Sequence, residues 1–257
     1  ATKLGARDFI EKPVSIEKLL ASAEEVLSQN IVGEDVFSHL VQNIPSFKKT
    51  LDEFGLLIQN ESVFIIEAEE GVDKTAWCKA LHSLKYNDQG EFKRLEFNES
   101  ESTNDLHQSV FLKSFDDKKN SVLFVENIEK LSEDKKALFS QKLIAYSSKK
   151  TLKIFIGVSG TDDAAFVNKD SFTTLNIPPL RSSLKEVPEI LDETVKYFVD
   201  RDGHRYRRFS LAAQNMLSKY QWPGNLPQLV DLVQALLSRK DKEIVNVDEI
   251  QEIITLQ

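Results

Sequence analysis

The stretch that most constrains the fold is Val63–His82, which reads VFIIEAEEGVDKTAWCKALH. It opens with four apolar residues, Val63–Ile66, of types that favour β-structure. A short acidic turn follows, and from Lys74 onward the apolar residues recur at helical spacing. A strand, a turn and a helix in this order predict one unit of an α/β layer with a parallel sheet.

The turn of this unit has the layout of a phosphate-binding P-loop, in which a strand, a glycine-rich turn, Lys-Thr and a helix follow one another. A working loop reads GxxxxGK followed by Ser or Thr, whereas residues 68–75 read AEEGVDKT. Both signature glycines are replaced, by Ala68 and Asp73. The candidates left for nucleotide binding in this loop are Gly71, Lys74 and Thr75.

The two replacements oppose nucleotide binding for physical reasons. Glycines let backbone N–H groups close around an anion without a Cβ clash, and Ala68 and Asp73 restore that bulk. The acidic side chains of the loop add negative charge where a triphosphate would sit, which costs roughly a kcal/mol or more for each close unscreened pair. Lys74 and Thr75 could still reach phosphate and magnesium, so nucleotide binding stays open.

Strands and helices alternate through the middle of the chain. Further strands are expected at residues 92–97, 121–126 and 152–158, of which the last two are the nearly continuous apolar runs of buried parallel strands. Helices are expected at residues 44–58, 74–85, 106–115 and 132–146. Beyond Pro178-Pro179 the pattern predicts helices with no strand among them, at residues 184–199, 210–220, 226–239 and 247–254. The expected fold class is therefore α/β, a P-loop core with a parallel sheet followed by an all-helical lid.

Composition narrows the function classes. The net charge of −8 and the pI near 5.2 argue against binding nucleic acid over a broad surface. The single cysteine, Cys78, excludes an internal disulfide, fits a reducing cytoplasm and is expected to be a small packed side chain. The four histidines lack metal-ligand spacing, and no apolar run is long enough for a membrane span. We expect a cytoplasmic protein with no metal site and no membrane partner.

Residues 1–30 are too few to close a core, and together with the absence of an initiating Met they suggest that the first part of a domain is missing. Their opening, KLGARDFIEKP, resembles the last strand and helix of a response-regulator receiver domain. The resemblance implies that Lys12 contacts a phosphorylated aspartate located upstream. The alternative, which we favour for the chain as given, is that Lys12 is a surface charge.

Three further tags follow in order: LVQNIP at residues 40–45, IPPLR at residues 177–181 with Val187-Pro188 beyond, and WPGNL at residues 222–226. Together with the receiver-type ending, they resemble the NtrC/NtrX-type response regulators that depend on sigma-54. This resemblance implies a receiver ending over residues 1–30, an AAA+ α/β core over 31–180 and a helical lid over 181–257.

The chain departs from the family at the positions that carry ATP hydrolysis. The Walker B strand, LFLDEI in the family, reads LFVENI here, so Asn127 replaces the carboxylate that polarises water, and an amide cannot act as that base. Glu126 remains a candidate for holding a metal through water. Val158-Ser159 stands where the family has the Thr-Asn that senses the γ-phosphate, and Pro227 where it has a lid arginine. The arginine-finger segment is shortened near Asp170 and lacks arginine.

The loop that contacts sigma-54 in the family, GAFTGA, is missing between Asn98 and Ser121. A sigma-54 contact is therefore doubtful. We expect instead self-association or contact with other regulator subunits, and contact with an upstream sensor kinase through the receiver part. No helix-turn-helix follows Ile254 in this chain, so no DNA-binding domain is expected in it.

Two functions follow from these patterns. The first is a response regulator of the transcription-regulator type whose degenerate AAA+ domain has no catalytic residues, needs no cofactor and acts through protein contacts. The alternative is an ATP-binding switch or weak ATPase that uses Mg²⁺ with Lys74, Thr75 and Glu126.

One basic run, from Arg201 to Arg208, is the only candidate nucleic-acid patch, because Tyr206 within it would suit base stacking. The alternative, which we favour, is a solvated loop between lid helices that ends at a helix cap formed by Ser210.

Overall fold

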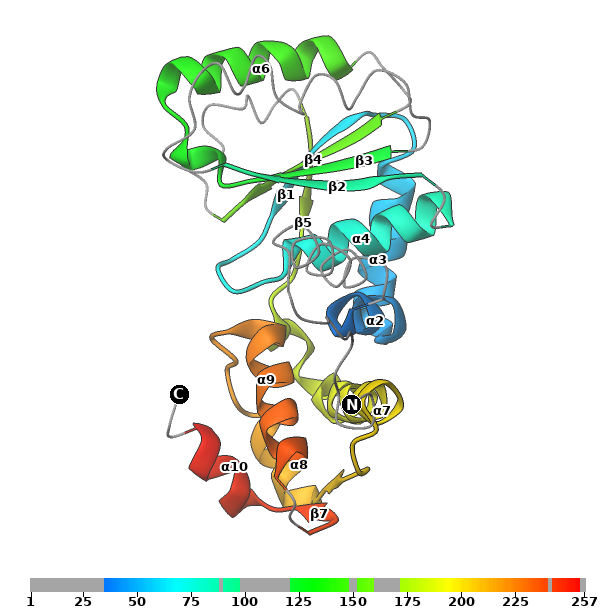
Figure 1. Ribbon diagram of the computed structural model, residues 1–257, viewed down its shortest axis with the longest axis vertical. Helices are drawn as coiled ribbons and strands as arrows, with labels where there is room; N and C mark the ends of the chain where they lie inside the picture. The colour runs from blue at the N-terminus through cyan, green and yellow to red at the C-terminus, as the bar shows by residue number, and fades with distance from the viewer. Residues whose placement is uncertain are drawn as a thin grey trace, which may run out of the picture. The chain divides into compact units, whose positions relative to one another are not determined.

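The computed structural model describes residues 35–87, 90–97, 121–147, 152–159, 172–239 and 242–254 (Figure 1). Residues 36–257 belong to one compact unit, to which the following description applies. Several expectations lie outside the described residues: the receiver-type ending with Lys12, the helix at residues 106–115, the missing GAFTGA loop and the shortened segment near Asp170.

Five of the described strands form a parallel sheet in the order β2-β3-β4-β1-β5. Their bounds are β1 Val63–Glu67, β2 Phe92–Glu96, β3 Ser121–Glu126, β4 Leu152–Val158 and β5 Thr173–Asn176. The first four confirm the predicted strands and the α/β class. The fifth was missed, because only Leu175 within it is buried and the segment has no apolar run.

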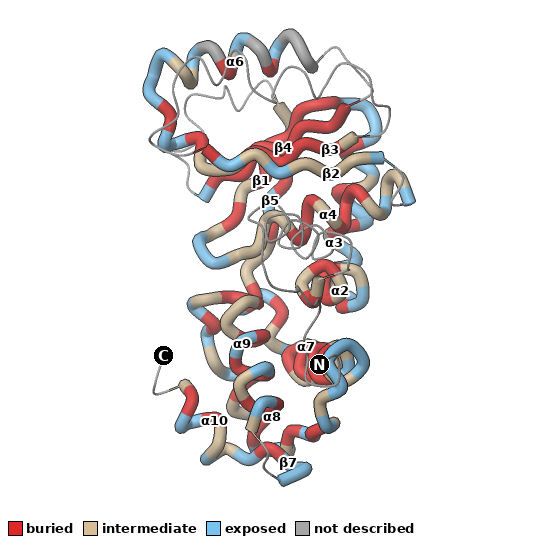
Figure 2. Tube along the Cα trace, in the orientation of Figure 1, coloured by how far each residue is buried: buried red, intermediate tan, exposed pale blue. Residues whose placement is uncertain are grey.

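Helices cover both faces of this sheet (Figure 1). Val63 and Ile65 of β1 pack with Phe139 and Leu143 of α6 (Glu133–Ser147). The alternate residues Phe64 and Ile66 face the opposite side, which is covered by α4 (Lys74–Tyr86). Successive strand residues point to opposite faces, and the central strands are buried along their length (Figure 2).

The expected helix at residues 44–58 is confirmed as α3 (Pro45–Leu57), and a further helix, α2 (Val36–Asn43), precedes it. Pro45 lies at the first position of α3, where its fixed φ and missing N–H favour a helix start. The chain therefore turns at Ile44, which is fully buried. The prediction missed α2, an eight-residue helix that buries Leu40 and Val41.

The lid consists of η4 (Leu180–Glu186), α7 (Val187–Asp202), α8 (Leu211–Leu217), α9 (Asn225–Ser238) and α10 (Val247–Ile254). Ser210 caps α8 as predicted, since its hydroxyl accepts a hydrogen bond from the Ala213 amide. The expectation of no strand was wrong, because β6 (Arg208–Phe209) pairs in parallel with β7 (Ile244–Val245). Two-residue strands leave no periodic signal in a sequence. Among the described helices, none combines the length and the apolar character that crossing a membrane needs.

Candidate functional site

The candidate site is the loop from Ala68 to Asp73, between β1 and α4, which we call the β1–α4 loop. Gly71 has a φ of +82°, a left-handed conformation that side-chain-bearing residues rarely adopt. The Val72 amide donates to the Glu69 carbonyl, and the Lys74 amide donates to the Val72 carbonyl. Backbone groups of the loop are thus already paired with one another.

Asp73 is the N-cap of α4. Its carboxylate accepts a hydrogen bond of 3.0 Å from the Ala76 amide. The free N–H groups and positive dipole end of a helix are what an anion binds in a P-loop. Here an anionic side chain of the protein itself occupies that position.

Lys74 and Thr75 lie in the first turn of α4, as predicted. The Lys74 ammonium donates to the Ser159 hydroxyl across 3.0 Å, just beyond the end of β4. A Cβ at Gly157 would lie 3.0 Å from the Phe124 ring and 3.4 Å from Lys74 Cδ, so this glycine leaves room chiefly for the Phe124 ring. The structure therefore brings Lys74 to Ser159, the residue that stands where the family senses the γ-phosphate.

Glu126, at the end of β3, is paired with an arginine that the sequence reading missed. Arg94 on β2 donates through Nε to Glu126 Oε2 at 2.5 Å, and its Nη2 lies 3.3 Å from Glu96 Oε2. Asn127 has a φ of +59°, and its amide donates to Glu96 Oε1 at 2.8 Å. Glu126 is thus neutralised by a guanidinium, and the Asn127 amide faces a carboxylate.

A metal centre needs several converging ligands. Among the residues that the structure describes, no three His, Cys, Asp or Glu side chains come together in a way that could hold an ion.

The lid contacts the β1–α4 loop through Arg181 and Glu69. Arg181 Nη1 donates to Glu69 Oε1 and Nη2 lies near Oε2, both at 2.5 Å, which is the bidentate geometry of a strong arginine–carboxylate pair. The hydrogen bond from Arg181 holds the pKa of Glu69 below its usual value, and the same bond raises the pKa of Arg181.

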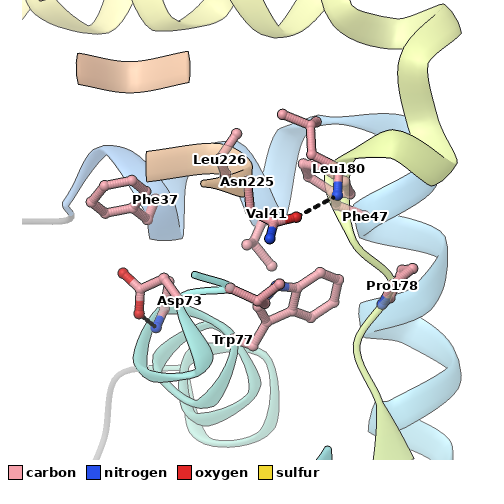
Figure 3. Close-up of a pocket in the computed structure, with 11 residues that line it drawn as sticks. Phe37, Val41, Phe47, Asp73, Trp77, Pro178, Leu180, Asn225 and Leu226 are labelled. Carbon is pink, nitrogen blue, oxygen red and sulfur yellow. Dashed lines mark hydrogen bonds between the residues drawn. The ribbon is translucent and has the colours of Figure 1, made fainter. Parts of the chain in front are cut away.

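Asn225, at the start of α9, makes a second contact between lid and loop. Its Nδ2 donates to Glu69 Oε1 at 2.8 Å and to the Glu70 carbonyl at 3.2 Å. Its Oδ1 accepts from the Leu180 amide at 3.0 Å (Figure 3). Asn225 is buried, and its backbone has a φ of +54°. In the same WPGNL tag Trp222 is buried and donates to the Leu217 carbonyl, so it packs within the lid.

A small cavity lies beside the loop (Figure 3). Its volume is about 20 Å³, which has room for about one water molecule. The lining is mostly apolar and comes from α2, α3, α4, the loop and the lid: Phe37, Val41, Phe47, Val72, Asp73, Ala76, Trp77, Pro178, Leu180, Asn225 and Leu226. A nucleotide base cannot enter without repacking these side chains.

The basic run beside β6 is a mostly exposed loop, as we favoured, except at Arg207 and the half-buried Tyr206. Arg207 is buried and donates to the carbonyls of Lys242 and Leu236 and to the carboxylate of Glu249. Tyr206 donates to Asp192 at 2.5 Å. Arg207 therefore holds the lid together, because it satisfies two carbonyls and a carboxylate from elements distant in sequence.

The residues from 181 to 256 match the family of AAA+ ATPase lid domains. Over 99% of its length the chain is 23% identical to the transcriptional regulatory protein ZraR of Klebsiella oxytoca, and over 96% it is 22% identical to the DNA-binding transcriptional regulator NtrC of a Bradyrhizobium species. It spans 66% and 59% of these two proteins, respectively.

The crystal structure of NtrX from Brucella abortus in complex with ADP superposes with a TM-score of 0.66 at 19% identity, covering 99% of this chain and 64% of that one. The predicted resemblance to NtrC/NtrX-type regulators is confirmed, and the fold is an α/β AAA+ fold with a helical lid.

Proposed function

We propose that the chain is part of a two-component response regulator that controls transcription, and that its AAA+ domain acts through protein contacts without hydrolysing ATP. The regulator role is supported by similarity to ZraR and NtrC along nearly the whole chain. The observation that carries the loss of chemistry is the Asp73 carboxylate on the N-terminus of α4, where a phosphate would bind.

Water activation is the next missing step. A general base must accept a proton from the attacking water, and the Asn127 amide cannot do so at neutral pH. The neighbouring Glu126 accepts a hydrogen bond from Arg94 at 2.5 Å, and this cation competes with any metal ion for the carboxylate. Asn127 and Glu126, the two residues at the Walker B position, therefore support the proposal that the domain does not hydrolyse ATP.

Binding without turnover is the second candidate function, an ATP-gated switch. It is favoured by the left-handed Gly71, by Lys74 in the first turn of α4, and by the solved complexes of NtrX with ADP and with ATP. In such a switch Lys74 and Thr75 would contact phosphate and magnesium. The side chains of Asp73 and Glu69 would have to leave their present partners first.

The contacts through which such a domain works are those of regulator subunits with one another and with a sensor kinase, in the cytoplasm. Residues 1–30 resemble the end of the family's receiver domain, which is the domain that a sensor kinase contacts. A contact with sigma-54 is not part of the proposal, because residues 98–121 lack the GAFTGA sequence.

The test is phosphate release from ATP with Mg²⁺ at high protein concentration, with Lys74→Ala as the matched control. We expect the unaltered chain and the control to release phosphate at the same background rate. A rate that clearly exceeds the control would contradict the proposal and favour the ATPase alternative.

A further inference from the structure

Three polar side chains join the β1–α4 loop to the lid. Glu69 belongs to the loop, Arg181 to η4, and Asn225 to the first turn of α9. Glu69 is 112 positions from Arg181 and 156 from Asn225, so the contacts fix the relation between two parts of the chain that are far apart in sequence.

We propose that Glu69, Arg181 and Asn225 form a clamp that holds the lid against the β1–α4 loop with no ligand bound. In this clamp the carboxylate of Glu69 accepts hydrogen bonds from both the Arg181 guanidinium and the Asn225 amide. The inference goes beyond the proposed function, because the clamp consists of the chain's own side chains and is tested whether or not nucleotide binds.

The geometry of the Glu69–Arg181 pair suits a clamp that can open. Each carboxylate oxygen meets one guanidinium nitrogen at 2.5 Å, and such a planar fork fixes direction as well as distance. The side chains keep 31% and 45% of their surface exposed, so water and salt weaken the attraction between them. The pair therefore sets an orientation that a partner or a high salt concentration can release.

Asn225 supplies the part of the clamp that does not titrate. Its carbonyl oxygen is held by the Leu180 amide within the lid, which leaves its amino group directed at Glu69 and the Glu70 carbonyl. The loop and the lid are neighbours here, since a Cβ on Gly71 would be in ordinary van der Waals contact, at 3.5 Å, with Asn225 Nδ2 and the backbone of Gly224. The hydrogen bonds of the buried Asn225 amide therefore form only when the β1–α4 loop lies against the lid.

Hydrogen–deuterium exchange tests the clamp at the Leu180 amide, which donates to Asn225, and at the amides of residues 69–73. We compare the unaltered chain with Glu69→Ala, Arg181→Ala and the double variant. Each single variant should exchange roughly threefold faster at these amides, and the double variant little faster than either, because the two residues act as one pair. Exchange in 1 M salt should also be faster in the unaltered chain.

The matched control is Arg239→Ala. It removes the exposed ion pair between Arg239 and Glu252 (2.9 Å), which lies within the lid and does not connect the lid to the β1–α4 loop. Unchanged exchange in Glu69→Ala and Arg181→Ala would overturn the clamp. Equal acceleration by Arg239→Ala would overturn it too, since the effect would then be general. An ATP titration of the unaltered chain, run in parallel, addresses the function separately: saturable binding would favour the ATP-gated switch, and the exchange result alone decides the clamp.

Discussion

The carboxylate of Asp73 accepts a hydrogen bond from the Ala76 amide across 3.0 Å, so the first turn of α4 carries its own anion. In a working P-loop the residue at this position is glycine, and the amides at the start of the helix are left for phosphate. The substitution therefore does more than add bulk. It fills the anion position with a covalently attached competitor and stabilises the helix at the same time.

Removing this competitor should restore affinity for nucleotide. We expect Asp73→Gly, and more strongly Asp73→Gly with Ala68→Gly, to bind a fluorescent ADP analogue with Mg²⁺ at least about fivefold more tightly than the unaltered chain, since a close like charge is worth roughly a kcal/mol or more. The measurement is fluorescence titration, and the control is Ser210→Gly, which removes a similar cap far from the loop. Equal affinities in all the chains would show that Asp73 is not the barrier.

The same residue should contribute to stability as a helix cap. Asp73→Ala is expected to lower the free energy of unfolding by about 1 kcal/mol, and Ser210→Ala by about the same amount, because each removes one side-chain acceptor at a helix start. Urea denaturation followed by circular dichroism measures both. A stabilising Asp73→Ala would mean that repulsion within the acidic loop outweighs the cap.

Arg207 should be a stability residue. Replacing it by Met leaves Glu249 and two backbone carbonyls without their donor in a largely buried place, so we expect a loss of about 3 kcal/mol. The exposed neighbour Arg208 is the matched control, and Arg208→Met should change stability by less than about 0.5 kcal/mol. Similar losses for the two variants in urea denaturation would argue against this role.

The contact of Glu69 with Arg181 should depend on pH. Arg181 holds the pKa of Glu69 below its usual 4.5, so the stabilisation is fully present above pH 4.5 and is lost as the pH falls through the lower value of the folded protein. The measurement is the difference in free energy of unfolding between the unaltered chain and Glu69→Gln from pH 7 to pH 3. The difference should shrink below pH 4.5, and a difference that grows there would be inconsistent with the pairing.

Cys78 should be inert in the folded protein. It is fully buried in α4, and this burial raises the pKa of its thiol, so few thiolates form and reagents cannot reach them. We expect iodoacetamide to modify it only at the rate of unfolding, and quickly in urea. Rapid modification in native buffer would show that α4 opens locally.

The strand and helix pattern was predictable wherever burial extends over several residues, as in β3, β4 and α4. It was not predictable where one or two residues decide the element. β5 buries only Leu175, and the missed helix α2 has only eight residues, because Pro45 starts a new helix just after it. The strands β6 and β7 exist because they pair with each other, which no local pattern reveals.

The candidate site divides in the same way. Gly71 in the β1–α4 loop and Lys74 and Thr75 in the first turn of α4 lie where the sequence predicts, because they are neighbours in the sequence. The long-range contacts of the site were not predicted, because only folding brings their residues together. Arg94 reaches Glu126 over 32 positions, and Asn225 reaches Glu69 over 156. A charged residue with a distant partner leaves no signal in a single sequence.

Whether the domain binds nucleotide is decided by titration of the unaltered chain with a fluorescent ATP analogue and Mg²⁺, next to Lys74→Ala. We expect no saturable signal up to millimolar nucleotide in either protein, since Asp73 occupies the anion position and the cavity beside it holds only about 20 Å³. Saturable micromolar binding that Lys74→Ala abolishes would show that Asp73 does not exclude nucleotide and would establish the ATP-gated switch.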